Sequence, residues 1–581
     1  MSRRSAFLLL LVILIVTFIP FLGLDLFSTK GEPREAVVAV SMLKSGNWIL
    51  PVTFGSEIPY KPPMLAWCIA ALGWLNGGHV TEFLSRLPSA LAMIALCLAG
   101  FSFYSRRTSV RLALAMALIT AGSFEMFRTA TICRVDMLLT GFMVTAIYAL
   151  YRQRERHPHS WAPSIAGALL MTGAVLTKGP VGMLLPCLVV WVLRLVKGNG
   201  FLRASVSVGL SGLMALIVPA LWYVAAYNQG GEEFLRLAME ENFGRFSGTM
   251  SYESHENPWW YNLLTLSYGL APYTLLLLFS LPALALCLRK NRRESNDNQS
   301  DTLSRSIGRR ARALWSRFRA MDAPTLLAVL GLMLIFLFYC FPKSKRSVYL
   351  LPCYPFAAYL IAVYIGWLLR RSKRVVETYC SFIASLLAIA SAALLLIGEG
   401  IYPASLETMG DGVLENLRIL ADSSVKPFLW SVVTLVSAII VMRKLWQKKT
   451  VAALTWAMVL IPMVYCMVQA AVLPAVMNPK SDKVEAQALQ QLVPGDEPIY
   501  SFRPQLMDRY YVANFYLGDR LKVFDHDWPT DGLLITGEYD FAELKARLPH
   551  PYEFEEITRL TRPNHETGQR TLLMRFRTPG Q

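Results

Sequence analysis

Long apolar runs separated by short polar segments fill most of the chain up to about residue 475. A helix needs about 20 mostly apolar residues to cross a bilayer. The runs predict thirteen transmembrane helices, near residues 6–26, 83–105, 110–127, 137–151, 161–176, 181–196, 204–227, 263–288, 323–341, 347–369, 375–398, 426–442 and 450–475. The pattern therefore predicts a polytopic α-helical membrane protein.

One further apolar run, "PPMLAWCIAALGWLNG" at residues 62–77, is predicted not to cross the membrane. It is short, begins with two prolines and is rich in tryptophan. These features are typical of a helix that lies in the membrane interface.

The basic residues fix the expected orientation. They cluster in short loops between apolar runs, and cytoplasmic loops are enriched in Lys and Arg. The clusters are Arg3/Arg4, Arg106/Arg107/Arg111, Arg152/Arg154/Arg156, Arg194/Lys197/Arg203, residues 289–319, Arg370/Arg371/Lys373/Arg374 and Arg443/Lys444/Lys448/Lys449. All lie on the cytoplasmic side if the N-terminus is inside. The formal net charge of +17 is thus a membrane-topology signal, and it does not indicate nucleic-acid binding.

This orientation divides the transmembrane domain, residues 1–477, between two faces. The outer face receives loops 27–82, 128–136, 228–262 and 342–346, together with the turn Thr177-Lys178-Gly179-Pro180. The inner face receives loop 289–322, whose first half is polar enough to be disordered. Its Arg-rich second half is expected to lie on anionic lipid.

Residues 478–581 have a different character and are predicted to form a small α/β domain on the outer face. Short β-type stretches appear in "EPIYSF", "DRYYVANFYL", "DGLLIT" and "RTLLMRFR", and "DFAELKARL" is typical of a helix. The nine cysteines all lie before this domain, mostly in apolar segments, without the spacing of a metal site. We interpret them as buried free thiols.

The outer loops contain three candidate catalytic carboxylates. Glu32 and Glu35 stand three residues apart in a short predicted helix, so they share a face. A solvated polar face is the alternative for this pair. Asp136 stands at the start of an apolar span, where an acid is costly unless it is paired or functional. A structural ion pair with Arg128 or Arg134 is the alternative there.

The same loops contain many cations at the depth of the lipid headgroups. Candidate binding residues are Arg34, Lys61, Lys178, Arg245, His255, Lys343 and Lys345. Lys343, Lys345 and Arg346 form a tight outer turn. They are an exception to the enrichment of Lys and Arg in cytoplasmic loops. Snorkelling to headgroups is one account of this turn. A phosphate site is the other, because several converging cations bind a lipid phosphate.

Carboxylates and cations together suit transfer of a group from a lipid phosphate carrier. The departing phosphate gains negative charge, which fixed cations stabilise, and a carboxylate can orient or deprotonate the acceptor. The sequence contains neither GxxxxGK[ST] nor GxGxxG with an acid at the required distance. Activation by a nucleotide is therefore not indicated.

Six motifs occur in a shared order: "GEPREAVVAVSMLKSGNWILP", "YKPP", "RVDMLLTGF", "LTKGP", "RF…H…PWWY" and "KSKRSVYLLPCYP". Over most of residues 1–360 the chain resembles the lipid A aminoarabinose transferases. These belong with the protein O-mannosyltransferases among the C-type, polyprenyl-phosphate-dependent glycosyltransferases. The resemblance implies the C-type glycosyltransferase fold, with thirteen transmembrane helices and a periplasmic C-terminal domain. It also implies a Gram-negative inner membrane, an undecaprenyl-phosphate sugar donor and a lipid acceptor such as lipid A.

The resemblance also implies roles for single residues. Asp136 matches the family's acid at the mouth of a span, and Lys61 matches the lysine that meets the carrier phosphate. Arg245 resembles its arginine partner. Lys345 and Tyr349 match the stretch that closes over the phosphate. Glu32 matches the glutamate of the family's "DE" pair.

The chain departs from the family at three positions. Gly31 stands where the family has Asp, Glu35 where it has Tyr, and Tyr60 where it has Glu. Glu32 or Glu35 could replace the missing carboxylate. A divalent metal at the outer face stays possible, and no other cofactor is indicated. The sugar is aminoarabinose or a related one.

Two other functions stay open. A protein O-glycosyltransferase would need a true base for its Ser or Thr acceptor, which would make Glu32 and Asp136 more important. A lipid-linked sugar flippase would have charges along a path through the membrane and repeated halves. The charges here gather at one face, which favours a transferase.

Overall fold

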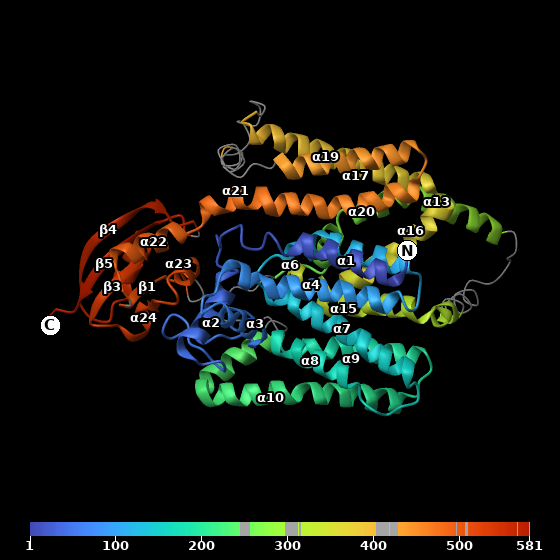
Figure 1. Cartoon of the computed structure of the whole chain (residues 1–581). Helices are drawn as coiled ribbons and strands as arrows, with labels where there is room; N and C mark the ends of the chain where they lie inside the picture. The colour runs from blue at the N-terminus through green and yellow to red at the C-terminus, as the bar shows by residue number, and fades with distance from the viewer. Residues whose placement is uncertain are drawn as a thin grey trace.

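Helices form an elongated bundle, and a small sheet domain lies at one end of it (Figure 1). The computed structural model describes residues 1–244, 256–296, 315–401, 428–495, 497–505, 509–565 and 567–579, with Arg312 and Arg418. The chain begins at the end of the bundle that is remote from the sheet domain. The two predicted faces of the protein therefore correspond to the two ends of the bundle.

The bundle contains most of the helices of the described chain. They are α1 (Arg3–Phe18), α4 (Glu82–Tyr104), α5 (Val110–Gly122), α6 (Phe124–Ala130), α7 (Val135–Arg156), α8 (Ile165–Lys178), α9 (Val181–Val196), α10 (Phe201–Met239), η1 (Glu240–Gly244), α12 (Tyr261–Gly269), α13 (Tyr273–Asn296), α15 (Ala323–Cys340), η2 (Ser347–Cys353), α16 (Tyr354–Arg371), α17 (Lys373–Gly398), α19 (Phe428–Trp446), α20 (Thr450–Met467), η4 (Val468–Val472), α21 (Leu473–Met477) and η5 (Asn478–Lys480).

Every predicted span overlaps a helix or a bent pair of helices, although α1 ends at Phe18, before the predicted end of its span at residue 26. Among the described residues, eight helical segments are long and apolar enough to cross a membrane, and counting each bent pair as one span gives up to ten. The bent pairs are α5 with α6, at 66°, and α12 with α13, at 102°. Three further predicted spans correspond to α1, α8 and α9, which have only 16, 14 and 16 residues. The protein is a multi-pass membrane protein, and the number of thirteen crossings stays a prediction.

Two predicted loops differ in extent from the structure or lie outside it. The outer loop 228–262 begins as helix, because α10 continues to Met239 and bends at Gly231, where φ is 55°. Glycine adopts this left-handed conformation without steric cost. The inner loop 289–322 begins as the end of α13, and its residues 297–311, 313 and 314 lie outside the described residues. The predictions of disorder and lipid contact fall largely on that part.

Helices α2 (Pro33–Ser45) and α3 (Met64–Leu75) lie between the bundle and the sheet domain (Figure 1). Pro33 suits the first helical turn, and Gly46 ends α2 with φ of 70°. With 12 residues, α3 is about 18 Å long. That is too short to cross a bilayer. Its exposed Trp74 and Leu75 agree with the predicted interfacial helix.

The C-terminal domain is built around one five-stranded sheet of order β2-β1-β3-β5-β4. Strands β1, β2 and β3 are parallel, and β5 pairs antiparallel with both β3 and β4. Its elements are α22 (Lys483–Leu492), β1 (Ile499–Phe502), α23 (Tyr511–Tyr516), β2 (Leu521–Val523), α24 (Phe524–Asp527), β3 (Asp531–Gly537), α25 (Asp540–Arg547), β4 (Glu553–Pro563) and β5 (Arg570–Arg577). The predicted α/β composition is correct.

One predicted strand is wrong. Within the stretch "DRYYVANFYL", Tyr511–Tyr516 form helix α23. The reason is topological, because β1 and β2 are parallel and the chain must cross over between them. The Asn514 side chain fixes the end of this crossover: its Nδ2 donates to Asp519 Oδ1 at 2.7 Å, and its Oδ1 accepts from Leu521 N at 2.9 Å.

The sheet domain is fastened to the first outer loop. A hairpin at residues 53–57 inserts the fully buried Phe54 into the domain's core, edge-on to Tyr511. The Phe54 carbonyl accepts from Val523 N at 3.1 Å, and its N–H donates to Asp519 Oδ1 at 3.1 Å. Arg509 Nε donates to Glu57 Oε1 at 2.6 Å. The hairpin is thus part of both domains.

Candidate active site

Asp136, Lys178 and Tyr349 come together from three elements. Asp136 lies in the first turn of α7 and Lys178 in the last turn of α8. These are the helix ends at which an anion and a cation are favoured. Lys178 Nζ donates to Asp136 Oδ1 at 2.5 Å and lies 4.4 Å from the centroid of the Tyr349 ring, which η2 provides. Gly179, with φ of 77°, and Pro180 turn the chain away after the lysine.

The partner of Asp136 differs from the sequence-based alternative. Arg128 pairs with Glu125, three residues earlier on α6, at 2.6 Å. The guanidinium of Arg134 lies against Gly31. Lys178, which is 42 residues away from Asp136, is the partner that closes this ion pair.

Glu35 and Lys61 form a second ion pair between α2 and the segment before α3. Both are largely buried, with side chains 11% and 18% exposed. Burial raises the pKa of Glu35, but Lys61 and Arg34 outweigh that effect and leave the pKa below its ordinary value. Burial lowers the pKa of Lys61 to about 8, although Glu35 opposes this change. The pair therefore holds a carboxylate beside a lysine that titrates near neutral pH.

Tyr60 lies next to Lys61 in the sequence and close to two cations. Its ring lies 5.8 Å from Arg34 Cζ and 5.6 Å from Lys61 Nζ, measured to the ring centroid. An aromatic face attracts cations without neutralising them. The Tyr60 ring is thus close to two cations of the site.

Arg134 connects the two ion pairs. It precedes α7, and its charge acts on both Glu35 and Asp136, as does that of Lys61. Its guanidinium lies against Gly31, where a Cβ would be only 2.3 Å from Arg134 Nη2. Gly31 therefore leaves the space that this arginine occupies.

Glu32 has different partners from Glu35, although the sequence predicted that the two share a face. Its two carboxylate oxygens accept from Arg86 Nε and Nη2 at 2.8 and 2.9 Å, and Oε2 also accepts from Cys133 N at 2.7 Å. Arg86 is fully buried within α4 and also donates to the backbone oxygens of Leu22 and Asp25. Sequence analysis missed Arg86, although an arginine inside an apolar span was the available signal.

The remaining predicted residues are Lys343, Lys345, Arg245 and His255. Lys345 is buried, and its Nζ donates to Pro342 O at 2.6 Å, within its own turn. Lys343 is exposed. Asn257 Nδ2 donates to Lys345 O at 3.2 Å, which ties this turn to the segment that precedes α12. Arg245 and His255 lie outside the described residues.

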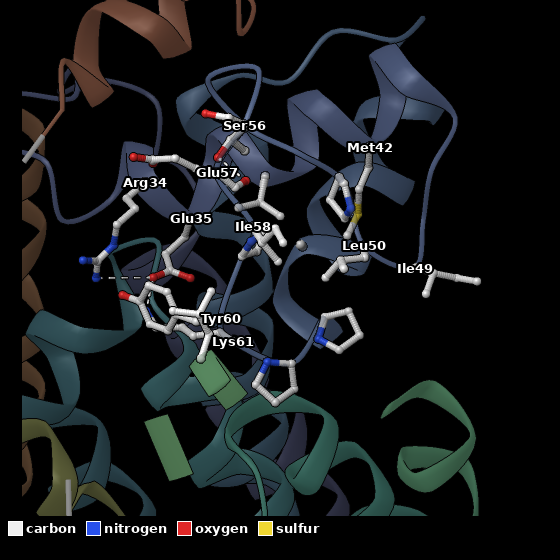
Figure 2. Close-up of a pocket in the computed structure, with 18 of the residues that line it drawn as sticks. Arg34, Glu35, Met42, Ile49, Leu50, Ser56, Glu57, Ile58, Tyr60 and Lys61 are labelled. Atoms are coloured by element: carbon white, nitrogen blue, oxygen red, sulfur yellow. Dashed lines mark hydrogen bonds and ion pairs between the residues drawn. The ribbon is translucent and has the colours of Figure 1, made fainter. Parts of the chain in front are cut away.

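A cavity of about 220 Å³ adjoins the Glu35–Lys61 pair. It is bounded by α2, by segment 49–63, by both arms of α10 and by the sheet domain, with mostly apolar walls. Figure 2 shows Arg34, Glu35, Tyr60 and Lys61 together on one side, with Ile49 and Leu50 on the other. Arg34 Nε is buried and, within the described part of the chain, has no hydrogen-bond partner.

A metal site in a protein needs several ligand side chains close together. Among the described residues, no group of three or more His, Cys, Asp or Glu side chains could hold a metal ion. Eight cysteines of the described chain are free, as the sequence predicts. A metal requirement stays untested.

The sequence resembles known proteins over most of its length. A profile of the dolichyl-phosphate-mannose-protein mannosyltransferase family matches residues 60–223. An uncharacterised protein of Aquifex aeolicus (strain VF5) is 29% identical over 67% of this chain and 69% of that protein. The undecaprenyl phosphate-alpha-4-amino-4-deoxy-L-arabinose arabinosyl transferase of Pectobacterium carotovorum is 25% identical over 71% of this chain and 68% of its own.

The fold is shared over almost the whole chain. The crystal structure of ArnT from Cupriavidus metallidurans bound to undecaprenyl phosphate superposes with a TM-score of 0.69 at 18% identity, covering 99% of this chain and 98% of that one. The chain is thus similar both to a mannosyltransferase family named for dolichyl phosphate mannose and to an arabinosyl transferase named for undecaprenyl phosphate. The chain has the ArnT fold through its C-terminal domain as well as its bundle. The family profile includes Lys61, Asp136 and Lys178 and ends before η2.

Proposed function

We propose that the protein is a bacterial inner-membrane enzyme that transfers a sugar from undecaprenyl phosphate to lipid A or another lipid or glycan at the periplasmic face. The sugar is aminoarabinose or a related one. The observation that carries the proposal is the pair of buried lysine–carboxylate contacts, linked by Arg134, at the end of the bundle with the sheet domain. The sequence and fold similarities support the same reaction class.

In this proposal the cations receive the donor phosphate. Lys61, Arg134 and Lys178, with Tyr349 beside Lys178, supply positive charge where the phosphate departs. The bond between the anomeric carbon and the phosphate oxygen breaks, and its electron pair stays on the phosphate. Fixed cations stabilise that charge without reorganisation. Glu35 and Asp136 hold Lys61 and Lys178 in place before the donor binds.

The acceptor attacks the anomeric carbon directly, which inverts its configuration. A phosphate acceptor is already anionic, so the carboxylates orient it. A hydroxyl acceptor would pass its proton to Asp136 or Glu35. Glu32 positions the loop that ends in Arg134, since it binds Arg86 and Cys133 at once.

The test is a transfer assay with purified protein, undecaprenyl-phosphate-linked sugars and lipid A. We expect a glycosylated lipid and free undecaprenyl phosphate. Product on a peptide but not on a lipid would replace the acceptor with a protein. Movement of donor across vesicles without any product would contradict the transferase and favour a flippase.

The pKa of Lys61 gives a pH prediction. Phosphate binding requires the protonated amine, so kcat/KM for the donor should fall as pH rises through about 8. Lys61→Arg should remove this alkaline decline, because a guanidinium stays protonated. Measuring kcat/KM across neutral and alkaline pH for both proteins checks this. An unchanged decline in the variant would assign it to another group.

The space beside Gly31 gives a second prediction. Gly31→Ala places a Cβ against Arg134 Nη2 and should displace this cation. We expect KM for the donor to rise about tenfold, which is roughly 1.4 kcal/mol of binding. Gly200→Ala is the matched control, since nothing lies within 4 Å of its added Cβ. Equal KM values in the two variants would exclude Arg134 from donor binding.

A further inference from the structure

A second cavity lies at the inner end of the bundle, where the chain begins. Its volume is about 690 Å³, and α1, α4 and the start of α5 surround it. The lining includes Arg3, Arg4, Phe7, Phe101, Ser105 and Arg106. None of the residues that line it is acidic. Three arginines therefore face one space without a carboxylate beside them.

The cavity also contains a buried hydroxyl group that lacks a partner. Ser105, the residue that caps α4, is 8% exposed, and in the described chain its Oγ makes no hydrogen bond. Buried polar atoms in proteins are almost always hydrogen-bonded. The neighbouring Arg107 is instead paired with Glu155, so the free groups are those that line the cavity.

Helix ends and aromatic rings complete the surroundings. Helices α1 and α5, of 16 and 13 residues, both begin here, so their positive ends are near. The C-terminus of α4 also lies here and contributes a partial negative charge. The full positive charges of the three arginines are larger than this partial charge. The Phe7 and Phe101 rings pack 6.2 Å apart between the first turns of α1 and the last turn of α4. The site thus combines a cationic rim with an apolar wall.

We propose that this cavity binds the phosphate headgroup of an anionic membrane lipid from the inner leaflet. Arg3, Arg4 and Arg106 contact the phosphate, Ser105 Oγ donates to one of its oxygens, and an acyl chain lies along Phe7 and Phe101. Arginine suits phosphate because it offers paired donors. Basic pockets between transmembrane helices on the cytoplasmic side are suited to such headgroups. The site is separate from the proposed transfer reaction, which lies at the other end of the bundle.

The test is native mass spectrometry of the delipidated full-length protein with phosphatidylglycerol or phosphatidylcholine. We expect bound phosphatidylglycerol on the wild type and much less phosphatidylcholine. The double variant Ser105→Ala/Arg106→Gln should lower the phosphatidylglycerol-bound fraction about fivefold, as expected for the loss of one arginine near a phosphate. Arg3 and Arg4 stay unchanged because they set the orientation of α1.

The matched control is Arg371→Gln/Ser372→Ala, which alters an arginine and a capping serine at the end of α16. It should retain wild-type lipid binding. Arg106→Gln alone changes an exposed side chain and should give a smaller loss without disturbing the fold. Equal lipid binding by wild type and double variant would overturn the proposal. So would displacement of the lipid by inorganic phosphate alone, which would assign the cavity to a soluble anion.

Discussion

Asp136→Asn should lower kcat for sugar transfer by about a hundredfold or more, the range expected when a positioned acid–base group is lost. The side chain is 6% exposed, and its Oδ1 accepts from Lys178. Asparagine keeps the shape and removes only the charge. Lys178 then lacks the anion that fixes it beside Tyr349. Steady-state kinetics, with kcat separated from KM for donor and acceptor, measures the effect.

Asp540→Asn provides the matched control. Asp540 is also buried, also lies in the first turn of a helix, and also pairs with a cation, Arg503, at 3.3 Å. Its position in the sheet domain is remote from the proposed chemistry. Transfer by this variant should stay near the wild-type rate. If both variants lose activity equally, the loss reflects folding, and Asp136 has no special part in the reaction.

Arg86→Met should be the most destabilising single change at the outer end of the bundle. Methionine fills the space but leaves the Glu32 carboxylate and the Leu22 and Asp25 carbonyls without their donor. Removing one partner of a buried ion pair costs about 3–5 kcal/mol. Unfolding of the detergent-solubilised protein, followed by heat or denaturant, measures this loss.

The comparison for Arg86 is Arg577→Met. That arginine pairs with Glu553 at 2.6 Å, but both side chains are more than half exposed. Exposed pairs contribute about 0–1 kcal/mol, so the variant should unfold near the wild type. A loss of similar size in the two variants would show that the contacts of Arg86 add nothing beyond those of a surface pair.

The sequence was sufficient to locate the helices, because hydropathy reports directly on the membrane. The outer face, which was inferred from the Lys/Arg distribution, stays a prediction. The sequence also grouped Asp136, Lys178 and Lys61, because all three were predicted to lie on the same face of the membrane. It could not determine the pairing. Which cation reaches Asp136 depends on how α7 and α8 pack, and an arginine only two residues away was the simpler expectation.

In the sheet domain, too, the sequence pattern predicted only some of the elements. Strands β1, β3 and β5 have several buried apolar residues, which the pattern detected. Strand β4 was missed because it is largely exposed and rich in charge. Helix α23 was misassigned because its buried aromatic residues resemble those of a strand. Only the parallel pairing of β1 with β2 requires a helix between them.

The shared hairpin has a consequence for how the enzyme is made. Phe54 and the nearby Lys61 leave the ribosome long before the residues that enclose Phe54, which include Tyr511 and Val523. Until the sheet domain has been synthesised, the hairpin that precedes Lys61 lacks the residues that enclose Phe54. A chain that lacks the sheet domain would keep the ion pair of Lys61 with Glu35 but lose the packing of Phe54 against Tyr511 and Val523. The hairpin that precedes Lys61 therefore reaches its final packing only after the sheet domain has folded.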